Sequence, residues 1–412
     1  MLKKSLLSLL VFVLFLVSVL SSEVVASTEG ISQIFFVDGT LLNGQSLTIT
    51  GKNFGTSGPV LQVFEDFDDL GNPAGGEPDL NATVGEWSGY SSSYWDTQYN
   101  SISRSGSYSG ELSGIKNIGT PTHAYHAGFF IDFPASTEYF LSYAVQIPKG
   151  TYFPHIDSDA VGPNAFPSGS NWKFAWIRDY ENDPDASPGD DDKCLPTYTS
   201  TKLIRTDGND LNASNGSSSI RIYDDTAGGP GDTWWQWGSW NRFAFWGKAD
   251  ATNPSTVSGN EWAQGIGEGV EQISRTNTTD PLFASGHAPY QWTRLHINGW
   301  IRETEIADPI ELLYDDIYFA VGPNAAARVE IGNNPVYSKC TKLAIATPES
   351  WDDTTISIRV REGGFSANEI VYLFVINSNN IPSVGYGPLT FGNDANKFPT
   401  LLPPSLKPPI TN

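Results

Sequence analysis

The chain has 412 residues, including 40 Gly and 27 Pro, and its 46 acidic residues against 24 basic ones give a formal net charge of −22. With 39% hydrophobic and 13% aromatic residues it has ample apolar surface for a core, which argues against a disordered protein. The Gly and Pro content argues against long helices, and the negative charge argues against nucleic acid as a partner because phosphates would be repelled.

The first 26 residues are typical of a signal peptide. Lys3 and Lys4 precede an apolar run at residues 6–20, and a small-residue cleavage site ends at Ala26. The run is shorter than the roughly 20 apolar residues that a membrane span needs. We therefore expect a secreted or cell-surface protein, cleaved after Ala26, that is not an integral membrane protein once cleaved.

Short alternating runs bounded by turn-forming residues predict strands at both ends of the mature chain. Two are expected near the start and five near the end, which together make the seven strands of an immunoglobulin-like sandwich. At residues 355–360, Ile356, Ile358 and Val360 are expected to share one face. The seven predicted strands are residues 31–37, 45–50, 328–331, 342–346, 355–360, 370–376 and 388–391.

The motifs in these two regions carry a family resemblance. Residues 44–55, which end in Lys52-Asn53-Phe54-Gly55, resemble the opening of an IPT/TIG domain, the immunoglobulin-like module of many bacterial surface proteins. Residues 328–332 and 351–356 resemble its second half. The resemblance implies one discontinuous domain, residues 28–60 plus 328–393, that carries an insert at residues 61–327 and is followed by a Pro-rich tail at 394–412.

The insert must have neighbouring ends to be tolerated inside a loop. Its first strand, at residues 63–69, is acidic, and its last, at residues 313–319, contains Asp-Asp-Ile. The pair resembles the end strands of concanavalin A-like jelly rolls of the lectin, glucanase and polysaccharide-lyase kind. We therefore expect an all-β protein, with a jelly-roll β-sandwich inserted into a discontinuous immunoglobulin-like β-sandwich.

Carboxylates gather on these two end strands, and such jelly rolls sometimes hold a structural calcium. A hard cation takes six to eight oxygen ligands, so convergence of the carboxylates would make a Ca²⁺ site. Alternatively, they are solvated at strand ends. The candidate ligands are Glu65, Asp66, Asp68, Asp315 and Asp316.

The densest aromatic stretch lies at residues 233–246. Period-2 alternation would bury one face of residues 240–246 in the sandwich core. Trp234, Trp235 and Trp237 follow a Gly-rich turn and are the candidates for an exposed platform on which sugar rings stack.

Two further stretches alternate aromatic and cationic residues. In residues 171–180, Trp172, Phe174 and Trp176 are expected on the core face, opposite a face with Lys173, Ala175 and Arg178. Residues 292–303 place Arg294, His296 and Asn298 on one face. If the two strands adjoin, their polar residues would converge. Such a group could neutralise the carboxylate of a uronate unit and remove the C5 proton of that sugar, as in a polysaccharide lyase. Otherwise these are ordinary outer-face residues of a sandwich. The candidate catalytic residues are Lys173, Arg178, Tyr180, Arg294 and His296.

Cys194 and Cys340 are the only cysteines and would pair in an oxidising compartment, or else remain free thiols.

These patterns predict a polysaccharide-binding protein, with two alternatives. One is a lyase acting on a uronate-containing glycan, and the other is a structural or adhesive module that binds a protein partner. The sequence leaves open whether the chain is an enzyme. It favours a lyase over a hydrolase because Pro309 interrupts the nearest carboxylate cluster, at residues 305–311.

Overall fold

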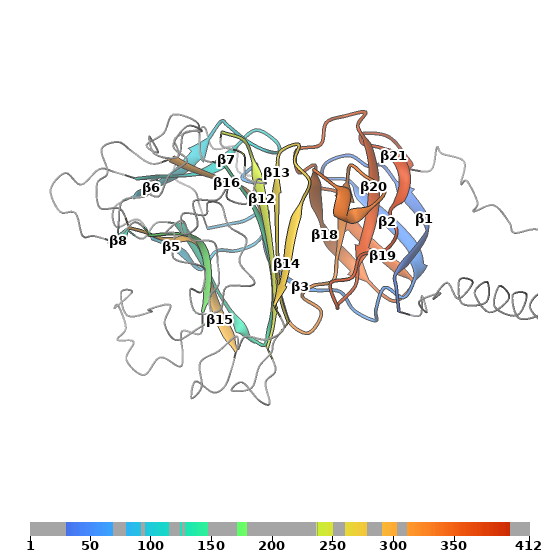
Figure 1. The fold of residues 1–412 in the computed structure, drawn as a ribbon, viewed down its shortest axis with the longest axis horizontal. Coiled ribbons are helices and arrows are strands. Elements are labelled where there is room, and N and C mark those ends of the chain that lie inside the picture. Colours follow the sequence, from blue (N-terminus) through green and yellow to red (C-terminus); the bar gives the residue numbers. More distant parts are fainter. Residues whose placement is uncertain are drawn as a thin grey trace, which may run out of the picture. The chain divides into compact units, whose positions relative to one another are not determined.

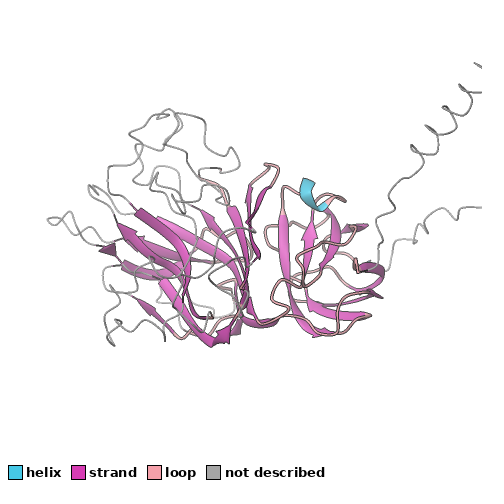
Figure 2. Cartoon of the chain, turned by 60° about the horizontal axis from the view of Figure 1, so that its bottom comes forward, coloured by secondary structure: helices cyan, strands magenta, loops and turns pink. Residues whose placement is uncertain are grey.

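The computed structural model describes eleven stretches of the chain, and the account below concerns these alone. Contacts divide the chain into two compact units, Met1–Ile31 and Ser32–Asn412, and every strand belongs to the second. Figure 2 shows the described residues as strands and loops with one short 3-10 helix, η2 (Tyr337–Lys339), so the all-β prediction is confirmed. None of the described segments forms a helix long and apolar enough to span a bilayer. The described residues are 30–68, 80–91, 95–114, 124–125, 128–146, 171–178, 236, 238–249, 260–277, 291–302 and 311–395.

Strands from the two ends of the chain lie on one hydrogen-bonded path (Figure 1). The second strand from the N-terminal side pairs with a C-terminal strand, Ile49 opposite Ile356. These are the regions that the sequence predicted to combine, although the immunoglobulin-like identity and the domain boundaries stay predictions. The order is β1 (Gln33–Gly39), β2 (Ser46–Lys52), β19 (Thr355–Arg359), β18 (Leu343–Trp351), β17 (Arg328–Gly332), β20 (Ile370–Ile376) and β21 (Tyr386–Thr390).

Strand β18 pairs with two strands, β17 and β19, so the seven-stranded path can fold around its core. Its first half pairs with β17, with Ala346 opposite Val329, and its second half pairs with β19, with Trp351 opposite Ile356. Alternate residues of the paired strands point inward and are wholly buried, as period-2 geometry requires. Ile356, Ile358 and Val360 share this core, as predicted.

A second sheet runs through the middle of the chain. Its strand β3 pairs along its length with the second half of β16, from Val60 opposite Val321 to Glu65 opposite Ile317. The chain therefore leaves and returns to the seven-stranded path on neighbouring strands, as expected for a tolerated insert. The order is β14 (Ile273–Asn277), β13 (Asn260–Gly267), β12 (Asn241–Lys248), β10 (Glu138–Gln146), β16 (Glu311–Val321), β3 (Val60–Glu65) and β4 (Val84–Gly85), with β7 (Ser109–Gly114) paired to β16 and β6 (Trp95–Asn100) to β7.

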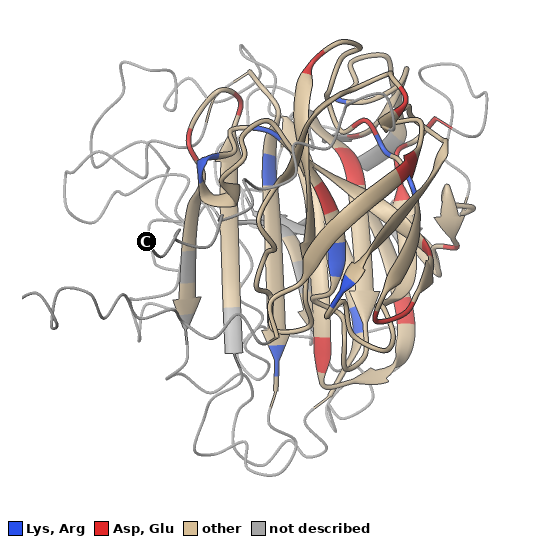
Figure 3. Cartoon of the chain, turned by 90° about the vertical axis from the view of Figure 1, so that its right-hand side faces the viewer, with Lys and Arg blue, Asp and Glu red and all other residues tan. Residues whose placement is uncertain are grey.

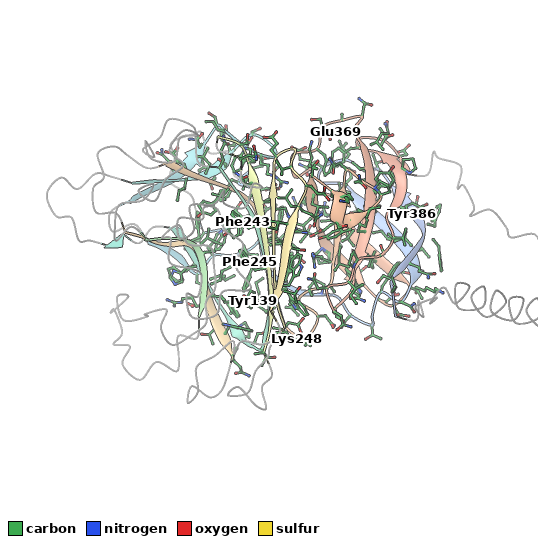
Figure 4. The ribbon with its side chains drawn as sticks, in the orientation of Figure 1. Tyr139, Phe243, Phe245, Lys248, Glu369 and Tyr386 are labelled. Carbon is green, nitrogen blue, oxygen red and sulfur yellow. The ribbon has the colours of Figure 1, made fainter. Side chains whose placement is uncertain are left out.

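A third sheet of five strands packs against the second. Leu295 and Ile297 on one of its strands meet Tyr143 and Phe243 of the nine-stranded sheet in a single buried cluster. Figure 4 labels Tyr139, Phe243 and Phe245, which belong to that cluster. The order is β11 (Asn171–Arg178), β15 (Trp292–Arg302), β9 (Gly128–Ser136) and β5 (Gly89–Ser91), with β8 (Ala124–Tyr125) paired to β15.

Strand β12 corrects one expectation about the aromatic stretch. Its residues from Asn241 to Gly247 are all buried, whereas alternation predicted one buried face. Phe243 and Phe245 point into the sandwich core, while Trp246 joins a second cluster with Ile345 of β18. The reason is that the other face of this sheet is covered by the C-terminal strands.

A buried ion network crosses this covered face. Glu330 of β17 accepts hydrogen bonds from Arg242 of β12 at 2.7 Å and from Arg328 at 2.8 Å. The Arg328 guanidinium also lies over the ring of Phe140 of β10, 4.1 Å from its centroid. These contacts connect the nine-stranded sheet to the seven-stranded path through charges removed from water. Figure 3 marks the charged residues by sign.

Candidate functional site

The outer face of the five-stranded sheet carries a row of charged residues across three strands. The register pairs Arg178 of β11 with Arg294 of β15, and Arg294 with Asp132 of β9. The Asp132 carboxylate accepts two hydrogen bonds from the Arg294 guanidinium, one from Nε and one from Nη2 at 2.7 Å. Leu295 and Ile131, which alternate with these residues, are buried in the core. The ion pair therefore faces away from the core.

A row of aromatic residues lies beside the charged row, two residues away along the same strands. Register places Trp176 opposite His296, His296 opposite Phe130, and Phe130 opposite Gly89 of β5. The imidazole of His296 stacks on the Phe130 ring, with centroids 5.5 Å apart and planes at 28°. The stacked rings of His296 and Phe130 therefore lie next to the Arg294–Asp132 ion pair.

Phe130 joins the two rows physically. The Arg294 guanidinium lies 4.6 Å from the Phe130 centroid, a cation–π contact, while His296 stacks on the same ring. The glycine at position 89 makes room for this ring, since a Cβ there would meet Phe130 Cζ at 2.5 Å. Ser88 fixes the neighbouring backbone, because its hydroxyl accepts the Asp132 N–H at 2.8 Å.

The predicted catalytic residues come together only in part. The shared contact with Phe130 shows that Arg294 and His296 lie on one face, and Arg178 is paired in register with Arg294. Lys173 pairs with Trp300 and lies three residues along β11 from Trp176, roughly 10 Å at strand spacing. Tyr180 lies outside the described residues.

The predicted faces of β11 need a correction. The sequence placed Ala175 on the outer, cationic face, yet Ala175 and Ile177 are buried in the sandwich core. The prediction was wrong because it assumed that the bulky aromatic residues mark the core face of the strand. On β11 the small Ala175 and the branched Ile177 fill the core instead.

Trp234, Trp235 and Trp237, the predicted sugar platform, lie outside the described residues. Their role stays a prediction. A flanking element is described: Asn241, at the start of β12, donates to the carbonyls of Gln236 at 2.8 Å and Ser239 at 2.9 Å, and so fixes the turn that follows Trp235.

The carboxylates of the predicted calcium site accept hydrogen bonds from protein groups or form ion pairs with them. Asp315 accepts the N–H groups of Arg104 at 2.7 Å and Ser105 at 3.1 Å. Asp316 pairs with the Arg104 guanidinium. Burial, with the neighbouring Asp316 charge, raises the pKa of Asp315 well above its usual range.

The other predicted ligands are also engaged. Asp66 pairs with Arg361 at 3.2 Å, and Glu65 accepts the Phe67 N–H at 2.7 Å. Asp68 accepts the N–H groups of Ser107 and Tyr108. Over the described part of the chain, no three His, Cys, Asp or Glu side chains are arranged to hold a metal ion. Calcium binding stays a prediction.

Cys340 is a free, buried thiol, and its Sγ lies 3.4 Å from the Asn334 carbonyl oxygen. Burial raises the pKa of this thiol to about 11. Its proposed disulfide partner Cys194 lies outside the described residues, so the pairing stays a prediction.

Sequence reasoning missed Phe130, Asp132 and Gly89. Residues 128–136 do carry a signal, since Phe129, Ile131 and Phe133 alternate with Phe130 and Asp132 as in a half-buried strand. Alternation finds the strand and its faces, but it does not say that this strand lies beside β15. That neighbour relation turns Asp132 into the partner of Arg294.

Comparison with known proteins gives distant structural likenesses. No family model matches the chain, and no curated protein matches it in sequence. The chain is similar to the endo-β-1,4-glucuronan lyase from the fungus Trichoderma reesei, with 10% identity and a TM-score of 0.38 over 65% of this chain and 98% of that one.

Two alginate lyases are similar to the chain at the same level. One is a variant of Aly36B in complex with an alginate tetrasaccharide, with 12% identity and a TM-score of 0.34 over 64% of this chain and 97% of that one. The other is the alginate lyase from Aplysia kurodai, with 10% identity and a TM-score of 0.35 over 65% and 99%. Likenesses this distant carry no conclusion about what this chain binds or cleaves.

Proposed function

We propose that the chain is a polysaccharide lyase that acts on a uronate-containing glycan at the outer face of the five-stranded sheet. The observation that carries this proposal is the Arg294–Asp132 ion pair beside the stacked rings of His296 and Phe130 on that face. Aromatic rings stack on the C–H faces of sugars, and cations beside them match the carboxylates of uronate units. A net charge of −22 opposes a polyanion in general, so binding requires such a local group of cations.

The chemistry is a β-elimination. A cation neutralises the uronate carboxylate, which makes the C5 proton acidic, and a base removes that proton. The electron pair forms the C4–C5 double bond as the C4–O4 bond breaks, and an acid returns a proton to O4. His296 and Tyr180 are the candidates for the two proton transfers, and Lys173 and Arg178 are candidates for neutralisation together with Arg294.

The test is release of unsaturated uronate products, which absorb in the ultraviolet, from polyglucuronate, polymannuronate and polyguluronate. The His296→Gln variant should lose at least about 100-fold in rate, the usual contribution of one acid–base group. As a matched control, Lys339→Gln alters a cation that is exposed and distant in sequence, and it should keep full activity.

A second candidate is a glycan-binding module that does not cleave, and the aromatic row favours it specifically. This reading holds if the wild-type chain retains polyuronates in affinity gels without releasing product, and if Phe130→Ala abolishes retention. If the chain neither binds nor cleaves any polysaccharide in the panel, both functions are wrong and the adhesive alternative remains.

We also propose that residues 1–26 direct export and are removed. Expression in a secreting host followed by N-terminal sequencing tests this, with Ser27 expected as the first residue. Another N-terminus, or retention of the protein in the cell, would contradict it.

A further inference from the structure

The Asp132–Arg294 pair divides the charged row into two parts. In the register, Arg178 of β11 stands opposite Arg294, and Asp132 of β9 stands on the other side of Arg294 and pairs with it. The Arg294 side chain is only 15% exposed, whereas Asp132 is 48% exposed.

This geometry changes what Arg294 is able to bind. Its Nε and Nη2 donors already form a two-point contact with the Asp132 carboxylate, which is the same contact a uronate carboxylate would need. The pair is electrically neutral, so an incoming carboxylate gains little there and also meets the half-exposed Asp132 oxygens. Sugar hydroxyls, in contrast, find an acceptor in Asp132.

We infer that the Asp132–Arg294 pair is a preformed subsite for the hydroxyl groups of a sugar unit, and that a cation other than Arg294 binds the uronate carboxylate. Phe130 lies beneath Arg294 and beside His296, which gives the sugar an apolar surface next to this subsite. This assignment rests on the proposed function, because it presumes a glycan on this face. It makes Asp132 a specificity-determining residue and removes Arg294 from the carboxylate-neutralising set.

Substitutions that remove the charge of Asp132, of Arg294 or of both test the assignment. Calorimetry measures the affinity for a uronate tetrasaccharide in the His296→Gln background, where cleavage does not consume the ligand. Asp132→Asn should tighten binding roughly five- to tenfold because it frees the Arg294 charge, and Arg294→Gln should weaken it by a similar factor. The double variant Asp132→Asn/Arg294→Gln should return to within about twofold of the background, since it removes one charge of each sign.

A second arm tests the hydroxyl contact with the same tetrasaccharide after reduction of its carboxyl groups. The double variant Asp132→Ala/Arg294→Ala removes the polar atoms and should weaken both ligands by a similar factor, roughly five- to tenfold. Thermal melts of each variant establish that it is folded.

The outcomes separate the two proposals. If the wild-type chain and the background bind neither tetrasaccharide, the proposed function fails. If they bind the uronate but the neutral double variant is as weak as Arg294→Gln alone, Arg294 is itself the carboxylate ligand and the subsite assignment is overturned. Unchanged affinity of the Ala double variant for the reduced tetrasaccharide overturns it equally.

Discussion

Glu330 is a buried carboxylate whose charge is held by three protein donors. It is fully buried and accepts hydrogen bonds from Arg242, Arg328 and the Tyr337 hydroxyl, the last at 2.7 Å. Burial alone would raise the pKa of this carboxyl, but the charges of Arg242 and Arg328 outweigh it and lower the pKa to about 2. The ionised form is therefore part of the folded state.

Replacing Glu330 with Gln should lower the free energy of unfolding by about 3–5 kcal/mol at pH 7, because it leaves two buried guanidinium groups without a counter-charge. A folded pKa of about 2, below the usual value, means that the wild-type advantage is complete above about pH 4.5 and is lost as the pH falls toward 2. Urea titrations at several pH values measure this difference.

Glu349→Gln is the matched control, since Glu349 forms a more exposed ion pair with Arg359 at 2.6 Å. Its cost should be below about 1 kcal/mol. A Glu330→Gln penalty that stays constant from pH 7 to pH 2.5 would contradict the role assigned to the carboxylate.

At the residue scale, the sequence predicted the faces of strands but not the contacts between neighbouring strands. Alternation placed Arg294 and His296 on one outer face, and their common contact with Phe130 confirms it. The same reasoning did not find Asp132, whose importance depends on which strand neighbours β15. Strand order in a sheet is a non-local property, and local alternation carries no information about it. For the same reason, the buried partners of Glu330 were not predicted.

At the scale of elements, the short strand β5 makes room for the Phe130 ring because its first residue is a glycine. Gly89 stands opposite Phe130, and the ring lies where a Cβ would be. The missing side chain leaves room for the ring, which contacts both His296 and Arg294. The strand pattern of β9 was readable from sequence, but the need for a glycine beside it was not.

Gly89→Ala should displace the Phe130 ring and lower polyuronate affinity or cleavage roughly tenfold, while thermal stability falls only modestly. The measurement is activity and binding at a temperature where the variant is fully folded. Gly44→Ala serves as the control, because Gly44 has a positive φ of 75° with nothing near its Cβ position. It should cost about 1 kcal/mol of stability through backbone strain and leave activity unchanged. If the two variants are equally active, the ring position does not matter for the site.

At the scale of the molecule, buried contacts connect the insert to the C-terminal strands. Trp246 and Phe64 of the insert pack with Ile345, and Arg361 pairs with Asp66 while lying 4.5 Å from the Phe64 centroid. The seven-strand prediction came from alternating runs near the two ends of the chain, and it found strands in the right regions. It did not predict that the insert would share a core with the strands that follow it. An alternating pattern predicts that one face of a sheet is buried and the other is exposed to solvent, whereas here both faces of the nine-stranded sheet contribute to cores.

We therefore expect residues 32–395 to unfold in one cooperative transition by calorimetry. Arg242→Met should lower the transition temperature by several degrees, because Arg242 and Glu330 are 4% and 0% exposed. Lys339→Met breaks an exposed ion pair with Glu271 that also joins the insert to the C-terminal region, and it should shift the transition by less than about 1 °C. Two resolved transitions, or equal effects of the two variants, would contradict a shared core.

The pairing of β2 with β19 also has a consequence for synthesis. Ser46 of β2 donates to Glu349 of β18, the strand beside β19, at 3.0 Å although the two residues are 303 positions apart. At about 5–20 residues per second, a ribosome takes roughly 15–60 s to make the partner of the first hairpin. During that interval Leu47 and Ile49 have no core to enter, because most of the residues that bury them, Val329 to Ala395, are made last. A growing chain of this protein therefore carries an unpartnered apolar hairpin for most of its translation, which makes that hairpin a natural target for a chaperone.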